Sequence, residues 1–261
     1  MSDFSQPLVS IFTHVLNAED TIEKTMLSVF SQTYKNIEYI IVDGDSTDNT
    51  VQIIKKYDKQ ISAWISEKDK SAADAFGKAY RMTKGDIIFS LCADDWVHKD
   101  AIQEIVDSFK KNKKSLFVYG DMVMVSKNIQ KLVSGDIDYN ANFKIGNPTF
   151  VYPSIAYKRE VFERFGVISL KYFYHNDYDY LLKLSTNNIE STYTNKFKVY
   201  RLPGGYGDSG GLKSLLEIAL ISRKYKLPFI SQFIKGSISL LIVFFLTSLK
   251  KLRGLFNGQS N

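Results

Sequence analysis

The sequence predicts an α/β fold in which helices flank a mostly parallel central sheet. Over roughly the first 110 residues, short apolar runs alternate with segments of helical periodicity, which implies right-handed crossovers between parallel strands. No internal repeat and no long low-complexity linker breaks the chain. With 261 residues, 44% of them hydrophobic, the chain is long enough for one large domain with a sizeable core and an appendage.

Four strands and four helices are predicted in this first part. The strands are runs rich in β-branched and aromatic residues, at positions 9–13, 37–42, 61–65 and 87–92. The helices carry apolar residues three and four positions apart, at 19–30, from 51 onward, at 72–82 and around 102–109.

The pattern is less regular after residue 115. Short strands are predicted at 116–119 and 122–125, on either side of a turn at Gly120 and Asp121, and further strands at 155–157 and 196–202. Helices are predicted at 159–165 and 177–184. A segment with five glycines in nine residues, 203–211, is expected to be a flexible loop.

The net charge of +6 is unevenly distributed along the chain. The first 217 residues carry 27 basic and 28 acidic side chains. No acidic residue follows Glu217, and seven basic residues do: Arg223, Lys224, Lys226, Lys235, Lys250, Lys251 and Arg253. A nucleic-acid-binding protein spreads its positive charge over a folded face, so no nucleic-acid partner is predicted. A basic tail favours an anionic membrane surface instead.

The same tail contains an apolar segment. Residues 236–249 are 14 positions without a charge, flanked by lysines. As a helix this segment would reach roughly 21 Å, short of the ~30 Å hydrocarbon core of a bilayer. We therefore expect a helix that lies on the membrane or inserts shallowly, with a true span or a core-packing helix as the alternatives.

Cysteine usage indicates a reducing compartment. Cys92 is the single cysteine, so no internal disulfide is possible, and the N-terminus does not resemble a signal peptide. A cytoplasmic location is expected. Cys92 lies inside the strand predicted at 87–92 and is interpreted as a small buried hydrophobic residue rather than a nucleophile.

Acidic residues cluster at the ends of the predicted strands. Asp94 and Asp95 follow the strand at 87–92, Asp43 and Asp45 follow the second strand, and Thr13 ends the first. Ligands bind outside the carboxyl ends of strands in open α/β sheets. Adjacent carboxylates repel each other, so a divalent cation that carries nucleotide phosphates would suit this edge. The alternative is a polar turn that opens a helix, because Asp is common at such positions.

Taken together, a series of short motifs resembles the family 2 glycosyltransferases, which are inverting nucleotide-sugar enzymes of the GT-A fold. The first motifs, in chain order, are 13–17, 41–50, 66–70 and 93–95. Asp74 and Lys78 match an Asp and a Lys of the family's helix after the third strand. The resemblance continues through 152–154, 159–166 and 176–179 and covers about residues 8–218.

The resemblance implies roles for particular residues. Thr13 and Asp43 would line the pocket for the base and ribose, and Asp45, Asp74 and Lys78 would belong to the same donor site. The Ala-Asp-Asp element at 93–95 matches the family's DXD motif, in which Asp94 would contact ribose and Asp95 the divalent metal. Asp177 matches the family's general base. From its residues alone, the segment around Asp177 could also be only a polar helix N-terminus.

The predicted protein is thus a glycosyltransferase that uses Mg²⁺ or Mn²⁺. It would move one sugar, with inversion, from a nucleoside-diphosphate sugar to a lipid-linked or growing glycan acceptor, in bacterial O-antigen or capsule assembly. Residues 1–218 would form the catalytic domain, with a nucleotide-binding half at about 8–115 and an acceptor-side half at about 116–218. Residues 219–261 would form a tail that holds the enzyme on the inner face of the cell membrane.

Two other functions remain open at this point. A sugar-nucleotide nucleotidyltransferase has a related sheet, but it requires a glycine-rich, basic loop after the first strand, and residues 13–20 contain no Gly, Lys or Arg. The second is a non-catalytic subunit that binds a nucleotide sugar. An Asp177→Asn variant separates this possibility from catalysis.

Overall fold

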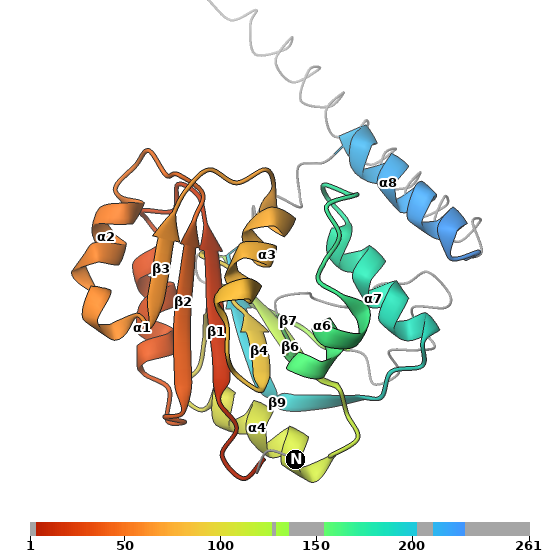
Figure 1. The fold of residues 1–261 in the computed structure, drawn as a ribbon, viewed down its shortest axis with the longest axis horizontal. Coiled ribbons are helices and arrows are strands. Elements are labelled where there is room, and N and C mark those ends of the chain that lie inside the picture. Colours follow the sequence, from red (N-terminus) through yellow and green to blue (C-terminus); the bar gives the residue numbers. More distant parts are fainter. Residues whose placement is uncertain (1–3, 127–128, 136–153, 203–210, 228–261) are drawn as a thin grey trace, which may run out of the picture.

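The computed structural model describes residues 4–126, 129–135, 154–202 and 211–227 (Figure 1). Three predicted features lie outside these ranges: positions 152 and 153 of one family motif, the glycine-rich loop at 203–210, and the apolar segment at 236–249. None of the helices within the described ranges is both long and apolar enough to cross a bilayer.

The first part of the chain alternates strands and helices as predicted. Its strands are β1 Val9–Val15, β2 Ile37–Asp43, β3 Ala63–Ser66 and β4 Ile87–Ser90. Its helices are α1 Ile22–Phe30, α2 Thr50–Lys56, α3 Ala72–Met82 and α4 Ala101–Lys111, with a 3₁₀ turn at Asp58–Gln60. The bounds of α3 agree with the prediction at both ends. Its N-cap residue, Ser71, accepts a hydrogen bond from the backbone N–H of Asp74, which fixes where this helix starts.

The later part adds strands with both antiparallel and parallel pairings. These are β5 Asp95–Val97, β6 Phe117–Ser126, β7 Ile129–Val133, β8 Ile155–Lys158 and β9 Ser191–Arg201. Of these, β6 and β9 are parallel to each other. The helices are α6 Arg159–Phe165, α7 Asn176–Thr186 and α8 Gly211–Lys224. Helix α8 runs across position 218, where the sequence places the boundary between the catalytic domain and the tail.

The described strands form one mixed sheet in the order β3-β2-β1-β4-β8-β6-β9-β5, with β7 beside β6. Strands β1 to β4 are parallel to one another. The strand order reverses at β1, because β2 lies on one side of it and β4 on the other. Such a switch point is where open α/β sheets bind ligands, outside the carboxyl ends of the strands.

Both faces of the sheet are covered by helices, and each face has its own apolar core. On one side, β1 and β2 pack against α1, α2 and α4 through residues such as Ile11, Met26 and Phe109. On the other side, Phe12 and Phe76 belong to a second core with α3, α6 and α7 (Figure 1). This double coverage explains why the parallel strands are nearly continuous apolar runs.

The prediction of two strands around a Gly120-Asp121 turn is wrong. The segment is a single strand, β6, which pairs with β9 on both sides of a register shift between Tyr119 and Asp121. A glycine here signals close approach of another backbone rather than a turn. A Cβ on Gly120 would lie 2.1 Å from the carbonyl oxygen of Phe197 in β9.

Replacement of Gly120 should therefore destabilise the protein. Gly120→Ala forces β6 and β9 apart, and we expect a loss of roughly 1–3 kcal/mol in the free energy of unfolding, measured by urea denaturation. Gly77→Ala is the matched control, because a Cβ at Gly77 in α3 would have its nearest neighbour at 3.5 Å. A helix interior favours Ala over Gly by about 1 kcal/mol, so this control should be neutral or stabilising. Equal stability of the two variants would contradict the close packing of β6 on β9.

Candidate active site

The carboxyl ends of β1, β2 and β4 meet at one edge of the sheet. Asp43 ends β2 and pairs in register with Val15 of β1, while the backbone N–H of Leu91, just after β4, bonds the carbonyl of Phe12 in β1 at 2.9 Å. Asp94 follows three residues later. Since β1 lies between β2 and β4, and neighbouring strands lie about 4.8 Å apart, the two strands that carry the acids are roughly 10 Å apart.

Asp43 is a buried carboxylate that the fold holds firmly. It is 0% exposed. Its oxygens accept hydrogen bonds from the backbone N–H of Ser46 at 3.0 Å, the hydroxyl of Ser46 at 2.5 Å and the hydroxyl of Ser66 at 2.6 Å. These bonds offset the cost of burying the charge and fix the direction of the carboxylate at the sheet edge.

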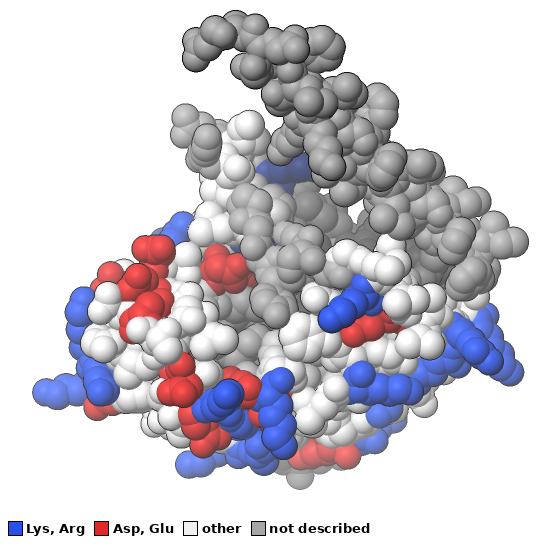
Figure 2. Space-filling view, turned by 90° about the horizontal axis from the view of Figure 1, so that it is seen from above, with Lys and Arg blue, Asp and Glu red and all other residues white. Residues whose placement is uncertain are grey.

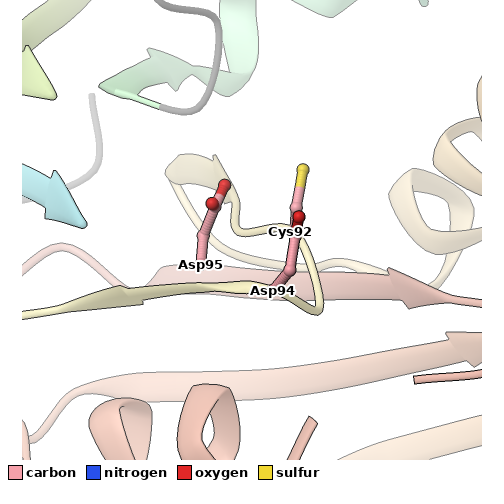
Figure 3. A group of neighbouring side chains, drawn as sticks. All are labelled: Cys92, Asp94 and Asp95. Carbon is pink, nitrogen blue, oxygen red and sulfur yellow. The ribbon is translucent and has the colours of Figure 1, made fainter. Parts of the chain in front are cut away.

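Asp95 is buried without such partners. It opens β5 and is 0% exposed, and within the described part of the chain its carboxylate oxygens have no nitrogen or hydroxyl donor, the thiol of Cys92 beside them being only a weak one. Figure 3 shows its side chain projecting to the same side as those of Asp94 and Cys92. One donor atom from each of the three residues lies within 4.8 Å of the others. Two carboxylates with free oxygens, and a thiol beside them, fit a divalent cation, because hard divalent ions take oxygen ligands.

Arg201 faces this acidic pair from β9. Strands β5 and β9 are antiparallel, and Asp95 stands directly opposite Arg201 in the register. Residues directly opposite in an antiparallel pair point to the same face of the sheet, which brings the guanidinium near the carboxylate. Burial and the charge of Asp94 raise the pKa of Asp95 to about 8, while the charge of Arg201 opposes this rise. One arginine therefore does not neutralise the site.

Asp177 lies near the same arginine. It is in the first turn of α7, and its Oδ1 accepts a 2.7 Å hydrogen bond from the backbone N–H of Tyr178. Burial raises the pKa of Asp177, and the charges of His175 and Arg201 oppose this rise. Asp95 and Asp177, far apart in the sequence, thus both lie within electrostatic reach of Arg201.

Two other predicted site residues at the strand ends are placed differently. Thr13 is fully buried, and its hydroxyl lies 2.9 Å from that of Tyr39 in the core on the α1 side. Asp45 is exposed, with a positive φ of 71° in the loop after β2. Asp45 is free to reach a ligand above the sheet edge, whereas the Thr13 side chain faces inward. A nucleotide contact at either residue stays a prediction.

Asp74 and Lys78 belong to an ion-pair cluster on α3. The ammonium of Lys78 lies 2.7 Å from Asp69, 3.0 Å from Glu67 and 3.8 Å from Asp74. Because three carboxylates surround the one ammonium group, the main structural role of Lys78 is to hold the loop between β3 and α3 in place. Gly44 makes room for this loop, because a Cβ there would lie 2.8 Å from a carboxylate oxygen of Asp69.

The sequence did not single out three of the groups at this edge. Cys92 is interpreted from the sequence as a buried hydrophobic residue, and no role is predicted for His14. Nδ1 of His14 is buried without a hydrogen-bond partner. Burial lowers its pKa, against the charges of Asp69 and Asp94. Arg201 went unnoticed because its importance comes from the pairing of β9 with β5. The one available signal was a cation at the end of a predicted strand.

Comparison with known proteins identifies the family of this chain. The family described as "Glycosyl transferase family 2" matches residues 10–166, more than half of the chain. The chain belongs to glycosyltransferase family 2. The glycosyltransferase is 34% identical over 217 residues to the Escherichia coli protein "UDP-Glc:alpha-D-GlcNAc-diphosphoundecaprenol beta-1,3-glucosyltransferase WfaP", which covers 80% of this chain and 83% of WfaP. It is 25% identical over 214 residues to a "PGL/p-HBAD biosynthesis glycosyltransferase" of Mycobacterium bovis, covering 80% of each.

Solved structures confirm the GT-A fold of the glycosyltransferase. Staphylococcus aureus TarS 1-349 in complex with UDP-GlcNAc superposes with a TM-score of 0.63 at 15% identity, over 86% of this chain and 69% of TarS 1-349. The mannosyltransferase PcManGT of Pyrobaculum calidifontis, in complex with GDP-Man and Mn²⁺, gives 0.64 at 17% identity, over 97% of this chain and 79% of PcManGT. At these identities the likeness supports the fold alone.

The described surface of the glycosyltransferase carries both signs of charge. Figure 2 shows Asp and Glu gathered on the left of the upper face, with Lys and Arg along the lower edge and on the right. A continuous basic band of the kind that tracks a nucleic-acid backbone is not seen among the described residues in this view.

The unpaired carboxylate of Asp95 should cost stability in the absence of metal. Its folded-state pKa of about 8 is above its ordinary value of 3.8, so as the pH rises through this window the unfolded chain loses the proton first and the native state becomes less stable. Asp95→Asn removes this titration. With chelator present, its melting temperature should exceed that of the wild type by on the order of 5 °C at pH 8, and by less at pH 5.

The matched control for this prediction is Asp45→Asn. Asp45 is exposed, and Asn tolerates its positive φ, so the control should melt with the wild type at both pH values. A constant difference between Asp95→Asn and the wild type from pH 5 to pH 8 would contradict the strained burial of Asp95.

Proposed function

We propose that this glycosyltransferase moves one sugar, with inversion, from a nucleoside-diphosphate sugar to a lipid-linked or growing glycan acceptor, with the help of Mg²⁺ or Mn²⁺. The observation that carries the proposal is the buried, unpartnered carboxylate of Asp95. It lies beside Asp94 and opposite Arg201, the same cation that acts on Asp177. A centre of this kind favours binding of a cation. A divalent cation would also stabilise the negative charge of a diphosphate leaving group.

The donor is proposed to lie along the edge formed by β2, β1 and β4. Asp43 and Asp45 follow β2, the strand on one side of β1, and would face the base and ribose. Asp94 would contact ribose from the β4 side. Thr13 would contribute to the donor site through the position of its strand. Asp74 and Lys78 would contribute through the ion-pair cluster that holds the loop before α3.

The metal is proposed to bind at Asp95, with Asp94 next to it. Both residues offer oxygen donors within reach of one ion. When bound, Mg²⁺ or Mn²⁺ would offset the negative charge that develops on the departing diphosphate. The charge of Arg201, opposite Asp95 in the register, would partly offset the repulsion between the carboxylates before the donor arrives.

Asp177 is proposed as the general base. It would accept the proton of the acceptor hydroxyl while the hydroxyl oxygen forms a bond to the anomeric carbon, and the bond from that carbon to the diphosphate breaks with its electron pair. A base works best when its pKa lies near the working pH, and the raised pKa of Asp177 is in that direction. Attack from the face opposite the leaving group gives inversion.

The setting is proposed from the relatives and from the basic tail. WfaP is named for transfer from UDP-Glc to a sugar on diphosphoundecaprenol, and the mycobacterial relative for PGL/p-HBAD biosynthesis. A comparable polyprenol-linked acceptor here would place the enzyme on the cytoplasmic face of the cell membrane, in O-antigen or capsule assembly. The acid-free sequence after Glu217 supports binding of the tail, 219–261, to anionic lipids.

Replacement of Asp177 tests catalysis against mere binding of a nucleotide sugar. With the active donor identified by a screen of nucleotide sugars, with and without Mn²⁺ or Mg²⁺, Asp177→Asn should lower kcat by about 10² to 10⁴. Its Kd for the donor, measured by calorimetry, should stay within about twofold of the wild-type value, because the proposed donor contacts lie at the ends of β2 and β4 and not on α7. Since the base must be deprotonated, the wild-type rate should fall as the pH drops through the raised pKa of Asp177.

Two outcomes would count against the proposal. An Asp177→Asn rate equal to that of the wild type removes this residue from the role of base. Undiminished transfer in excess chelator removes the metal from the reaction.

A further inference from the structure

Helix α8 has two faces of different chemistry, and neither has a part in the donor site. The inner face contacts the start of α7, the helix that carries Asp177 (Figure 1). The outer face consists of exposed leucines and basic residues. Each face supports an inference of its own.

The chain leading into α7 lacks a local cap. His175 is the N-cap residue of α7, and its side chain makes no capping hydrogen bond. The backbone N–H groups of the segment that enters a helix lie outside its ladder of hydrogen bonds, so they need acceptors from elsewhere. Within the described part of this chain, a residue of α8 supplies the acceptors for the backbone that enters α7.

That residue is Glu217. Its carboxylate accepts hydrogen bonds from the backbone N–H groups of Phe173 at 2.9 Å, Tyr174 at 2.8 Å and His175 at 3.1 Å. A carboxylate at a helix N-terminus is also favoured by the helix dipole. Beside it, the hydroxyl of Ser214 lies 2.6 Å from Nε2 of His175, so α8 holds both the backbone and the side chain of the N-cap residue.

The C-terminal end of α8 holds the same turn of α7. Lys224 donates to both carboxylate oxygens of Asp179, at 2.7 and 3.0 Å, and the hydroxyl of Tyr225 donates to the carbonyl of Asp179 at 3.1 Å. The side chain of Asp179 is 7% exposed. Asp177 therefore sits between two residues, His175 and Asp179, that are both tied to α8.

We infer that α8 sets the position of the catalytic base and that Glu217 is the positioning residue for Asp177. This inference rests on the proposed role of Asp177. Glu217 acts through the backbone of the turn, since its carboxylate bonds N–H groups just before α7 and Asp177 follows within that turn. Precise placement of a catalytic group matters because a displacement of about 1 Å can cost 10²-fold in rate.

The test replaces Glu217 with an isostere that is a poorer acceptor. Glu217→Gln keeps the size of the side chain but turns one oxygen into an N–H donor that faces other donors. We expect kcat to fall about 10- to 100-fold, with Kd for the donor within about twofold of the wild type. Glu163→Gln, at an exposed position of α6, is the matched control and should leave both unchanged.

Further variants separate this inference from the proposed function. In an Asp177→Asn background, Glu217→Gln should cause no additional loss, because it acts through Asp177. If Glu217→Gln proves unstable, Ser214→Ala, which removes only the bond to His175, should give a smaller loss of kcat with donor binding retained. A kcat within twofold of the wild type in the folded Glu217→Gln variant overturns the inference. A full rate in Asp177→Asn overturns the base assignment instead.

The outer face of α8 is apolar and basic. Leu212, Leu216 and Leu220, spaced four residues apart, are 69%, 56% and 56% exposed. Lys213 and Arg223 are exposed on the same side of the helix. Exposed leucines with basic side chains beside them let a helix bury apolar area in the interface of a bilayer while its cations meet anionic headgroups. The chain that continues after α8 carries further lysines and no acid, which suits the same surface.

We propose that the outer face of α8 rests on an anionic phospholipid bilayer. The proposal deepens the membrane association proposed for residues 219–261, because it brings the membrane contact onto the helix that positions the base. A lipid-linked acceptor would then enter from the same side on which α8 holds Asp177.

The experiment measures sedimentation of the full chain with vesicles of phosphatidylglycerol and phosphatidylethanolamine, and with vesicles of phosphatidylcholine alone. A variant with Leu212, Leu216 and Leu220 all replaced by Ser leaves residues 228–261 unchanged. Its partition onto the anionic vesicles should fall on the order of tenfold or more. The control replaces Ile129 and Leu132 of β7, which are 70% and 56% exposed, with Ser and should bind as the wild type does.

Three results would overturn the proposal. One is wild-type partition of the triple variant, which would assign binding to the tail alone. Another is equal binding of the wild type to both kinds of vesicle. The third is a dimer in solution, detected by light scattering, that the triple variant abolishes, since a second copy would then cover this face. Transfer to a water-soluble short-chain acceptor should persist in the triple variant, so its loss would point to the catalytic proposal rather than to the surface.

Discussion

The charge balance around Arg201 is the constraint on which the site depends. One guanidinium lies opposite Asp95 and acts on Asp177, while Asp94 adds a further negative charge beside Asp95. Buried carboxylates in excess of their cations are unstable unless another positive group arrives. The acidic centre therefore favours ligands that bring a cation, such as a nucleoside diphosphate with a divalent ion.

The fold brings this charge arrangement together from distant segments. Strand β4 ends at the switch point and delivers Asp94 and Asp95, while β9 crosses the sheet to place Arg201 opposite them. The register shift beside Gly120 lets the two long strands β6 and β9 remain paired along their length. On the far side, α8 holds the turn that carries Asp177. Each residue of the candidate site is thus positioned by a different long-range contact.

Much of the fold could be predicted because its signals are local. Alternating apolar runs and helical periodicity revealed β1 to β4 and α1 to α4, and strand ends marked Asp43 and Asp94 as neighbours. The errors came where a contact with a distant segment decides the outcome. Glycine at position 120 is typical of a turn, but here it allows the backbone of β9 to approach closely. Strand β5 is too short to show a periodic pattern. The roles of Arg201 and Glu217 depend on contacts with distant segments, which no local pattern predicts.

The sequence by itself determined the class of fold, the family and the set of acids available for chemistry, because spacing and side-chain type are local properties. Only the tertiary structure decided which of the acidic side chains are buried and which of those have hydrogen-bond partners. It satisfied Asp43 with Ser46 and Ser66 and left Asp95 without a partner. The physical reason is that the free energy of a charge depends on its solvation and its neighbours, which the chain acquires only when remote strands and helices meet.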